Sequence, residues 1–554
     1  MTETAISWMD RLAMEIEESQ PTAGRPIVCA SGISPSGPIH MGNLREVFTT
    51  HLVVEALRGR GHEAVHLHSW DDYDRLRKLP AGIDPSFAEH IGKPLSAVPD
   101  PGGRLDSYAD AFINELTGAL DTLGIEIHGV RQSEKYPRGD YNAEIRRAMD
   151  QRVVIFRALA AQQTAGRHDQ SEEERERKYY PFKPYCESCG TDNTTVDGYA
   201  GETVSYFCRC GYRGQMSLAD GARISGKLVW KADWPMRWAY EGVVFEPAGE
   251  DHHAPAGSFN VGAELVRTVF GGKRPLSTVY SFVTMAGANG KMSSSAGGVA
   301  IPATALDVIE PAIMRWLYTR RLPRQSFAID LGPQAVQRLY DEWDRFTAKA
   351  TGEGADPADA RVLAACVRTT AGEVAVTQRP VSFRLLGSAA DITQGNTDQI
   401  ARIVNAHLAP ADEVPTGELL ASLQPRLDCA INWATKLLAP EQRTVIRDSF
   451  DSATWRELDS SAREAVAALV PELAGSWTLD GLTTLVYGIP KRMLGLPEDA
   501  APTADLKKAQ REFFTVLYRL LCGADTGPRL PTLMLSIGLD RTTALLTPDP
   551  AAGS

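Results

Sequence analysis

The period of the hydrophobic positions changes abruptly within one short stretch near the start of the chain. An apolar run at residues 27–30 (IVCA) ends close to Gly32, and the sequence SPSGP at 34–38 then breaks the pattern. Beyond the break, the positions that recur at helical spacing are His40, Leu44, Val47, Phe48, Leu52, Val53 and Leu57. This spacing is that of one buried helix face. The pattern predicts a strand, a tight loop and a long helix that ends near Gly59 and Gly61.

The same alternation of short apolar runs and helical patterns continues to about residue 302. Strands are predicted at residues 64–70, 125–130, 226–234, 243–248 and 278–283, and helices at 104–123, 141–163 and 258–270. Strands separated by helices favour an α/β domain with a doubly wound parallel sheet. From about residue 333 to the end, apolar residues keep the helical period and no strand pattern appears. That half is therefore predicted to be an all-α domain.

Polar clusters follow two of the predicted strands. The sequence DDYD at 71–74 follows the second strand, and GEDHH at 249–253 follows the strand at 243–248. In a doubly wound sheet, ligands bind outside the carboxyl ends of the strands. Carboxylates there can hold a magnesium ion or an ammonium group, and we select Asp72 as a pocket residue. A solvated acidic turn explains each single aspartate equally well.

The loop before the first long helix is a candidate anion site. A helix N-terminus offers unpaired backbone N–H groups and a partial positive charge. His40 and Asn43, expected on the first turn, could add side-chain donors for a phosphate. The alternative is an ordinary glycine-rich loop with a surface histidine.

Composition narrows the class of protein. The chain has 554 residues, 43% of them hydrophobic and 23% charged, which predicts three or four globular domains. No apolar run approaches the roughly 20 residues of a membrane span, and the acidic N-terminus lacks a secretory pattern, so we expect a cytoplasmic protein. The net charge of −12 is mild evidence against nucleic-acid binding. A local basic stripe can still supply phosphate contacts.

Four of the eight cysteines form two close pairs, Cys186 with Cys189 and Cys208 with Cys210, separated by 18 residues. Two thiolate pairs on tight turns can close a tetrahedral zinc site, which holds together a small module without its own core. The role would be structural, because four protein ligands leave no open coordination position. Free thiols or a decayed site are the alternatives. The other cysteines are expected to be reduced core residues.

Two distant motifs carry a family resemblance. Residues 35–43 (PSGPIHMGN) resemble the HIGH signature of class I aminoacyl-tRNA synthetases, and residues 291–295 (KMSSS) resemble their KMSKS signature. Three stretches resemble the class I lysyl-tRNA synthetases in particular. They are the first motif in the form that it takes here, the sequence SWDDYDRLRK at 69–78 and the sequence GPRLP at 527–531. The resemblance covers nearly the whole chain.

This resemblance implies an enzyme that activates L-lysine with ATP and Mg²⁺ and transfers it to tRNA(Lys), acting as a monomer. The implied domains are a Rossmann-like catalytic domain (1–165 and 226–302), a zinc-bearing insertion (166–225), a stem-contact connector (303–335) and a helical anticodon-binding domain (336–554) of the α-helix cage type. The implied catalytic residues are His40, Asn43, Lys291, Ser293 and Ser295. The ATP site adds Pro35, Gly37, Gly42, Asp251, Met292 and Ser294. The lysine site would comprise Gly32, Ser34, Asp72, Trp230, His252 and Tyr280.

One departure from the family pattern keeps alternatives open. The usual second lysine of the KMSKS signature is replaced by Ser294, and Ala296 stands where relatives commonly recover a lysine. The alternatives are a catalytically weakened tRNA-binding paralogue, a class I synthetase for another amino acid such as glutamate, and a small nucleotidylyltransferase. Core packing is the ordinary role of strand aromatics such as Trp230 and Tyr280.

Overall fold

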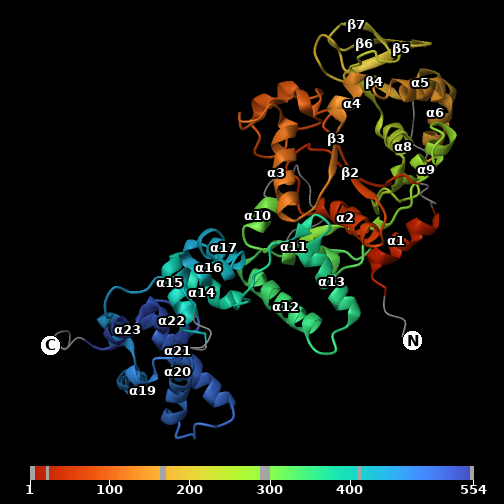
Figure 1. Ribbon diagram of the computed structural model, residues 1–554. Coiled ribbons are helices and arrows are strands. Elements are labelled where there is room, and N and C mark those ends of the chain that lie inside the picture. The colour runs from red at the N-terminus through yellow and green to blue at the C-terminus, as the bar shows by residue number, and fades with distance from the viewer. Residues whose placement is uncertain (1–5, 20–23, 163–169, 287–299, 409–413, 549–554) are drawn as a thin grey trace. The chain divides into compact units, whose positions relative to one another are not determined.

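The computed structural model describes residues 6–19, 24–162, 170–286, 300–408 and 414–548 (Figure 1). The chain divides into two compact units. The first comprises residues 1–306, 311–330 and 347–374, and the second comprises residues 307–310, 331–346 and 375–554. None of the helices in the described ranges is long and apolar enough to cross a membrane.

A parallel sheet forms the centre of the first unit. Its strands are β1 (Ile27–Ile33), β2 (Ala64–Trp70), β3 (His128–Arg131) and β9 (Val243–Phe245), in the order β3-β2-β1-β9. A parallel bridge from Phe245 to Leu276 and the parallel pair β10 (Ala248–Gly249) and β11 (Val279–Tyr280) continue beside β9. The predicted parallel α/β architecture is confirmed. All of these strands direct their carboxyl ends to the same edge.

Helix α2 (Leu44–Gly59) connects β1 to β2 and is buried on almost every face. Helix α1 (Trp8–Ser19) packs on it through Met9, Ala13 and Ile16, which are at most 1% exposed. The helical stripe predicted from the sequence is buried as expected. The helix begins at Leu44, so His40 and Asn43 lie in the turn before it and not on its first turn.

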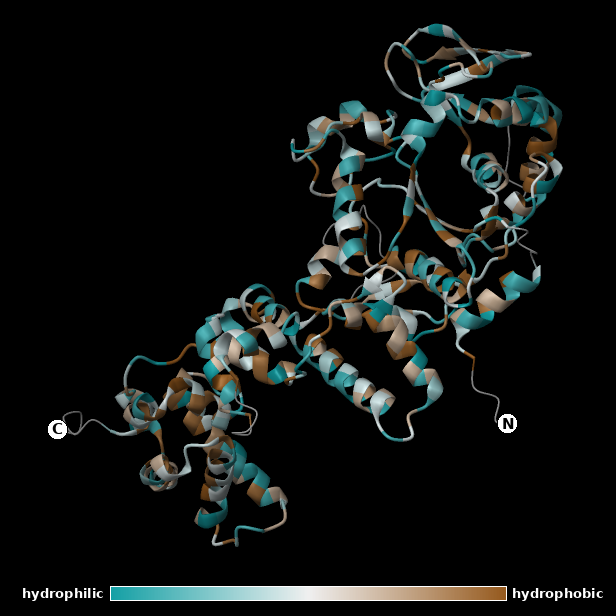
Figure 2. Cartoon of the chain, in the orientation of Figure 1, coloured by the Kyte–Doolittle hydropathy of each residue, from teal (hydrophilic) through white to brown (hydrophobic). Residues whose placement is uncertain are grey.

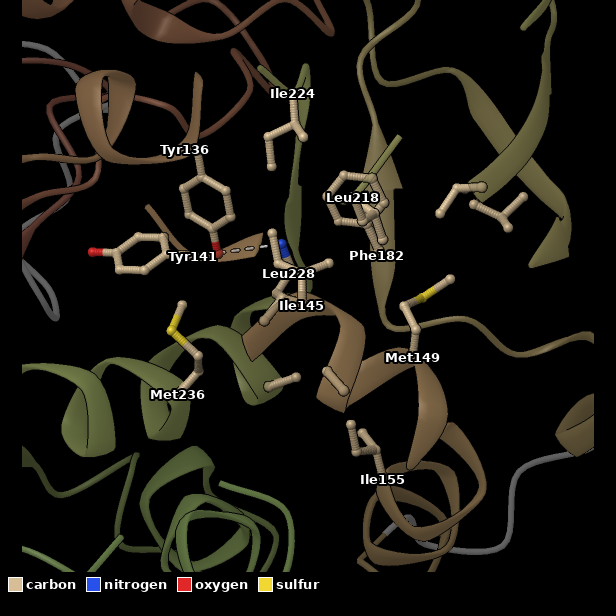
Figure 3. Close-up of a cluster of buried hydrophobic side chains, with 14 of the residues drawn as sticks. Tyr136, Tyr141, Ile145, Met149, Ile155, Phe182, Leu218, Ile224, Leu228 and Met236 are labelled. Carbon is tan, nitrogen blue, oxygen red and sulfur yellow. Dashed lines mark hydrogen bonds between the residues drawn. The ribbon is translucent and has the colours of Figure 1, made fainter. Parts of the chain in front are cut away.

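The segment between β3 and β9 contains helices and a small antiparallel module, which falls within the predicted insertion (166–225) except for β8 at its base. The helices are α4 (Gln132–Arg138), α5 (Asn142–Asp150), α6 (Arg152–Ala160) and α7 (Glu172–Lys178). The module has β5 (Thr194–Ala200), β6 (Thr203–Cys208) and β7 (Arg213–Ser217) in one sheet, and β4 (Phe182–Pro184) pairs antiparallel with β8 (Gly226–Leu228) at its base. Figure 3 shows the buried side chains that join this module to α4, α5 and helix α8 (Trp230–Glu241).

The first unit contains further helices and short strands. Its remaining elements are α3 (Tyr108–Thr122), α9 (Ser258–Thr268), β12 (Val283–Met285), α10 (Pro302–Leu306), α11 (Pro311–Thr319), β13 (Phe327–Ile329), α13 (Pro357–Val367), β14 (Arg368–Thr369) and β15 (Gly372–Glu373). Helix α12 (Pro333–Thr351) contributes residues to both units. The short β14–β15 hairpin corrects the expectation that no strand follows residue 333.

The described elements of the second unit are helices. The longer ones are α14 (Phe383–Ile392), α15 (Thr397–Asn405), α16 (Thr416–Ser422), α17 (Arg426–Asn432), α18 (Ser452–Glu457), α19 (Ser460–Leu469), α20 (Leu479–Met493), α21 (Ala504–Cys522), α22 (Leu530–Ile537) and α23 (Leu539–Leu546). Figure 2 shows brown and teal residues alternating along α20 and α21, as expected for amphipathic helices. Their apolar faces form one buried cluster that includes Leu482, Val486, Leu517 and Leu520.

The predicted strand at residues 226–234 is wrong beyond Leu228. Helix α8 begins at Trp230, so Trp230 and Trp234 lie one turn apart on a helix. The sequence GKLVWKADW taken alone predicts a strand, but Trp230, Trp234 and Trp238 recur at a spacing of four residues, which a helix places on one face. Burial of that aromatic face explains why the helix forms.

Candidate active site

A cavity of about 80 Å³ opens at the carboxyl edge of the parallel sheet. Its walls come from the ends of β1 and β2, from α2, from α8 and from the segment after β9. Three residues predicted for the lysine site, Gly32, Trp230 and His252, line this cavity together. Four carboxylates also line it: Glu46, Asp71, Glu241 and Glu246. Arg237 also lines the cavity, so four acidic groups face one basic group, and the cavity suits a ligand that carries positive charge.

Glu46 connects two residues of the predicted lysine site. Its carboxylate accepts the backbone N–H of Gly32 at 2.8 Å and the hydroxyl of Tyr280 at 2.6 Å. Tyr280 thus reaches the cavity wall through Glu46. Enclosure within the protein raises the pKa of Glu46 to about 8, although both hydrogen bonds act in the opposite direction.

Aromatic side chains form one wall of the cavity. The rings of Trp230 and Trp234 stack with centroids 5.1 Å apart, and His252 lies edge-on to Trp234 at 5.3 Å. Glu246 accepts the indole N–H groups of Trp234 at 3.0 Å and Trp238 at 2.5 Å. Burial raises the pKa of Glu246 to about 7. A ring face beside a carboxylate suits an ammonium group, because both attract cations.

The two aspartates that follow β2, Asp71 and Asp72, have different surroundings. Asp71 lines the cavity and accepts a hydrogen bond from Arg237 at 2.7 Å, and burial raises its pKa. Asp72, selected from the sequence, is 0% exposed. Its carboxylate accepts hydrogen bonds from Arg131 at 2.6 Å and from the backbone N–H of Ser133 at 2.9 Å. Of these two aspartates, Asp71 is among the described residues that line the cavity and Asp72 is not.

The loop that carries the HIGH-like motif is firmly held. His40 is 8% exposed, and its backbone N–H donates to the Asn43 side chain at 3.1 Å. Pro35 and Gly37 are buried, whereas Ser34, Gly42 and Asn43 are partly exposed. The described residues therefore leave Asn43 and Gly42 accessible beside the start of α2. Asp251, in the turn after β10, is exposed.

The KMSKS-like motif, Lys291, Met292, Ser293, Ser294 and Ser295, lies outside the described residues, as does Ala296. Ala300, shortly after the motif, accepts the backbone N–H of Met41 at 3.0 Å. Met41 is also the residue whose carbonyl accepts the hydroxyl of Tyr318 at 2.7 Å. The chain that leaves the second motif is therefore bonded directly to the loop of the first.

The four predicted metal ligands lie together. The sulfur atoms of Cys186, Cys189, Cys208 and Cys210 all lie within 4.8 Å of one another. The Cys186–Cys210 and Cys189–Cys208 sulfur distances are both 3.7 Å. A tetrahedron with Zn–S bonds of about 2.3 Å has edges of about 3.8 Å. The donor set and its spacing therefore fit a structural zinc ion.

Sequence reasoning missed Glu46, Glu241, Glu246 and Arg237. Glu46 was missed because its partner Tyr280 lies 234 positions away. The partners of Glu246, Trp234 and Trp238, lie only 12 and 8 positions before it, on a segment that the sequence pattern predicted in part as a strand. For α8 a signal existed, since the four-residue spacing of Trp230, Trp234 and Trp238 predicts a helix that would place Arg237 and Glu241 near the same wall.

Known proteins resemble this chain along its length. A family model described as "tRNA synthetases class I (K)" matches residues 6–370. A lysine–tRNA ligase from Streptomyces coelicolor is 46% identical, with 98% of each chain covered. One from Pyrococcus horikoshii is 32% identical, over 97% of this chain and 98% of the relative.

Among solved structures, a glutamate tRNA ligase from Elizabethkingia meningosepticum is 12% identical over 94% of this chain and 98% of its own, with a TM-score of 0.43. That likeness is too low to carry an assignment. The family model and the full-length relatives do carry one: the chain belongs to the class I lysyl-tRNA synthetase family.

Proposed function

We propose that the chain is a lysine–tRNA ligase. It activates L-lysine with ATP to lysyl-adenylate and pyrophosphate, and then transfers the lysyl group to the 3′-terminal adenosine of tRNA(Lys). The observation that best supports this proposal is the 46% identity to a lysine–tRNA ligase across 98% of the chain. The acidic cavity beside the HIGH-like loop supports the same assignment, because a glutamate site would require a cationic pocket.

Lysine binds in the cavity at the end of β1 and β2. Trp230 offers a ring face to the aliphatic chain and the ammonium group. Asp71 and, once the ammonium group is bound, Glu46 supply negative charge, and Tyr280 positions Glu46. Arg237 offsets part of this charge by its bond to Asp71. Gly32, Ser34 and His252 complete the site, while the structural setting of Asp72 favours a supporting role through Arg131.

ATP lies over the HIGH-like loop and the start of α2. The helix start attracts the phosphates, and His40 and Asn43 contribute polar groups near them. Pro35, Gly37, Gly42 and Asp251 shape the nucleotide site. From the other motif, Lys291 neutralises the leaving pyrophosphate, with Met292, Ser293, Ser294 and Ser295 beside it. Alignment and charge stabilisation account for most of the catalysis expected of such a site.

The remaining assignments concern metals, partners and location. Mg²⁺ accompanies ATP and neutralises phosphate charge. Zinc is held by Cys186, Cys189, Cys208 and Cys210, where it closes the small module. Residues 336–554, which include most of the helical second unit, are an anticodon-binding domain of the α-helix cage type, and residues 303–335 form the stem-contact connector. The protein acts as a cytoplasmic monomer.

Two assays test the proposal. ATP–pyrophosphate exchange is measured with each of the twenty amino acids, and aminoacylation is measured with radiolabelled lysine on total tRNA. We expect exchange with lysine alone and charging of tRNA(Lys). Exchange with glutamate instead, or tight tRNA binding without charging, would contradict the proposal and support one of the alternatives.

Active-site variants separate binding from chemistry. His40→Ala and Lys291→Ala are expected to lower the exchange rate by about 10²–10³ each, as loss of a transition-state donor does. The dissociation constant for lysine, measured by calorimetry, should stay near that of the wild type. A large loss of lysine binding in either variant would contradict the assignment of that residue to the phosphate site.

A further inference from the structure

The cysteine cluster is fixed to the segment that follows β2. The hydroxyl of Thr191 lies 3.3 Å from the Cys189 sulfur. The next residue, Asp192, is buried and donates its backbone N–H to the Gly92 carbonyl at 2.8 Å. Its carboxylate lies 3.2 Å from a guanidinium nitrogen of Arg75. The turn that the thiolates define is therefore bonded at two points to residues 75–92.

That segment leads directly to the cavity. Backbone hydrogen bonds of 2.8–2.9 Å pair residues 92–96 with residues 72–76. Asp71, which lines the cavity, comes directly before this paired stretch. A displacement of the cysteine turn would thus act through Gly92 on the chain that holds Asp71.

A second connection runs through the strands at the base of the module. Lys227 of β8 is buried and lies 2.5 Å from Asp74 and 3.5 Å from Asp233. Asp233 lies 3.3 Å from Arg237, which binds Asp71 at 2.7 Å. Buried charges of this kind hold each other in place, since moving one leaves its partner unpaired.

Apolar packing makes this base rigid. Figure 3 shows Phe182 of β4 and Leu228 of β8 among the side chains of the cluster around Tyr136. The hydroxyl of Tyr136 accepts the backbone N–H of Leu228 at 3.3 Å. The hydroxyl of Tyr185, directly before Cys186, donates to the Tyr73 carbonyl at 2.6 Å. Close-packed interiors have low compressibility and transmit strain.

We propose that the cysteine module is a positioning element of the amino-acid cavity. The metal-closed turn acts through Asp192 and Arg75, and β8 acts through Lys227, to hold Asp71 and Arg237 in the geometry that binds a cationic side chain. Asp192 and Arg75 are not among the described residues that line the cavity, so they act on the ligand only through others. This inference rests on the proposed function, because lysine is the ligand whose binding it modulates.

The test uses the full chain with Asp192→Ala. Calorimetry gives the dissociation constants for lysine and ATP, and metal analysis gives zinc per chain. We expect the lysine dissociation constant to rise on the order of 10-fold, with the ATP value and the zinc content unchanged. Cys210→Ser, which removes a ligand, should weaken lysine binding in the same direction. The double variant should be less impaired than the product of the two single effects, since both act on one path.

Asp197→Ala is the matched control. Asp197 forms a comparable ion pair with Arg213 at 3.1 Å on the same module, but it is exposed and lies on β5. Lysine binding of this variant should equal that of the wild type. Arg75→Ala breaks the same Arg75–Asp192 ion pair by removing the arginine. If Asp192→Ala loses its metal, the lysine affinity of Arg75→Ala tests the proposal in its place.

The proposal would be overturned if Asp192→Ala and Arg75→Ala retained zinc and bound lysine as tightly as Asp197→Ala does. Unchanged lysine affinity after metal loss in Cys210→Ser would overturn it as well. A wild-type chain that binds no lysine would instead overturn the proposed function itself.

Discussion

The hydroxyl of Tyr280 donates a hydrogen bond to Glu46 at 2.6 Å across 234 positions of sequence. The bond joins β11, in the two-stranded pair that continues beside β9, to the first turn of α2. The other carboxylate oxygen accepts the Gly32 N–H from β1 at 2.8 Å. One carboxylate therefore ties three segments together at the wall of the cavity, and its protonation state should matter for a cationic ligand.

Lysine binding should release protons, mainly from Glu46 and in smaller part from Glu246, whose pKa is about 7 in the same cavity. The pKa of Glu46 is raised to about 8, so the free site is mostly protonated at pH 7. A bound ammonium group favours the ionised carboxylate. Lysine affinity should therefore increase as the pH rises from about 6 to 8, with release of close to one proton near pH 7. Calorimetry in buffers of different ionisation enthalpy measures the proton count.

Glu46→Gln removes the titrating group while it keeps the acceptor for Gly32. This variant should release fewer protons and show a weaker pH dependence of lysine affinity. Glu250→Gln, on an exposed glutamate after β10, is the control and should behave as the wild type. An unchanged proton count in Glu46→Gln would exclude Glu46 as the source.

The local parts of this site could be predicted from sequence. The stretch from Ile27 to Gly59 forms a strand, a loop and a helix as predicted, because the period of its apolar residues changes from a continuous run to helical spacing. The spacing of Cys186, Cys189, Cys208 and Cys210 likewise predicted their cluster. In both cases the signal is contained in neighbouring residues.

The rest depends on contacts between distant segments. Glu46 gains its environment from Tyr280. The side chain of Asp71 accepts a hydrogen bond from Arg237, whereas that of its neighbour Asp72 accepts one from Arg131. A sequence pattern contains neither fact. The helix at Trp230 was missed for another reason, because nine residues with mixed alternation satisfy both the strand and the helix template.

Removal of the metal should loosen the cysteine module. The wild-type chain is expected to contain about one zinc ion, because the four thiolates form a closed tetrahedral set. Cys210→Ser should reduce the zinc content, and limited proteolysis should then cut within residues 186–211. Cys522→Ala alters a half-buried cysteine of the second unit and should change neither zinc content nor cleavage. A module that stays resistant without zinc would contradict the structural role of the metal.

The second unit depends on a buried ion pair. Arg426 lies 2.7 Å from Glu310 and 2.7 Å from Asp344, and Arg426 and Glu310 are at most 2% exposed. Arg426→Met should lower the free energy of unfolding of this unit by about 3–5 kcal/mol, because Glu310 is left buried and unpaired. Thermal unfolding followed by circular dichroism measures the loss.

Two further variants identify the cause of that loss. Adding Glu310→Gln to Arg426→Met should recover part of the stability, since it removes the unpaired charge. Arg384→Ala breaks a 2.7 Å pair with Asp341, whose two side chains are 49% and 35% exposed, so its cost should stay below about 1 kcal/mol. Equal losses in Arg426→Met and Arg384→Ala would show that burial of the pair has no effect.

Gly32→Ala should separate folding from ligand binding. A methyl group on Gly32 would lie 3.4 Å from the Ser69 carbonyl oxygen and 3.5 Å from its Cβ, which are ordinary contacts, so the fold should tolerate it. Gly32 nevertheless lines a cavity of only about 80 Å³. Misfit by one methyl group changes binding by about 10- to 200-fold. The dissociation constant for lysine should rise within this range, as measured by calorimetry.

The control is Gly59→Ala at the end of α2, where an added methyl group meets nothing within 4 Å. A helical Gly→Ala change adds up to about 1 kcal/mol of stability, and lysine binding should not change. Because the two variants add the same group at opposite ends of the β1–α2 unit, a difference in lysine affinity between them reports on the cavity alone. Equal lysine affinity in both, with both folded, would place the amino acid elsewhere than beside Gly32.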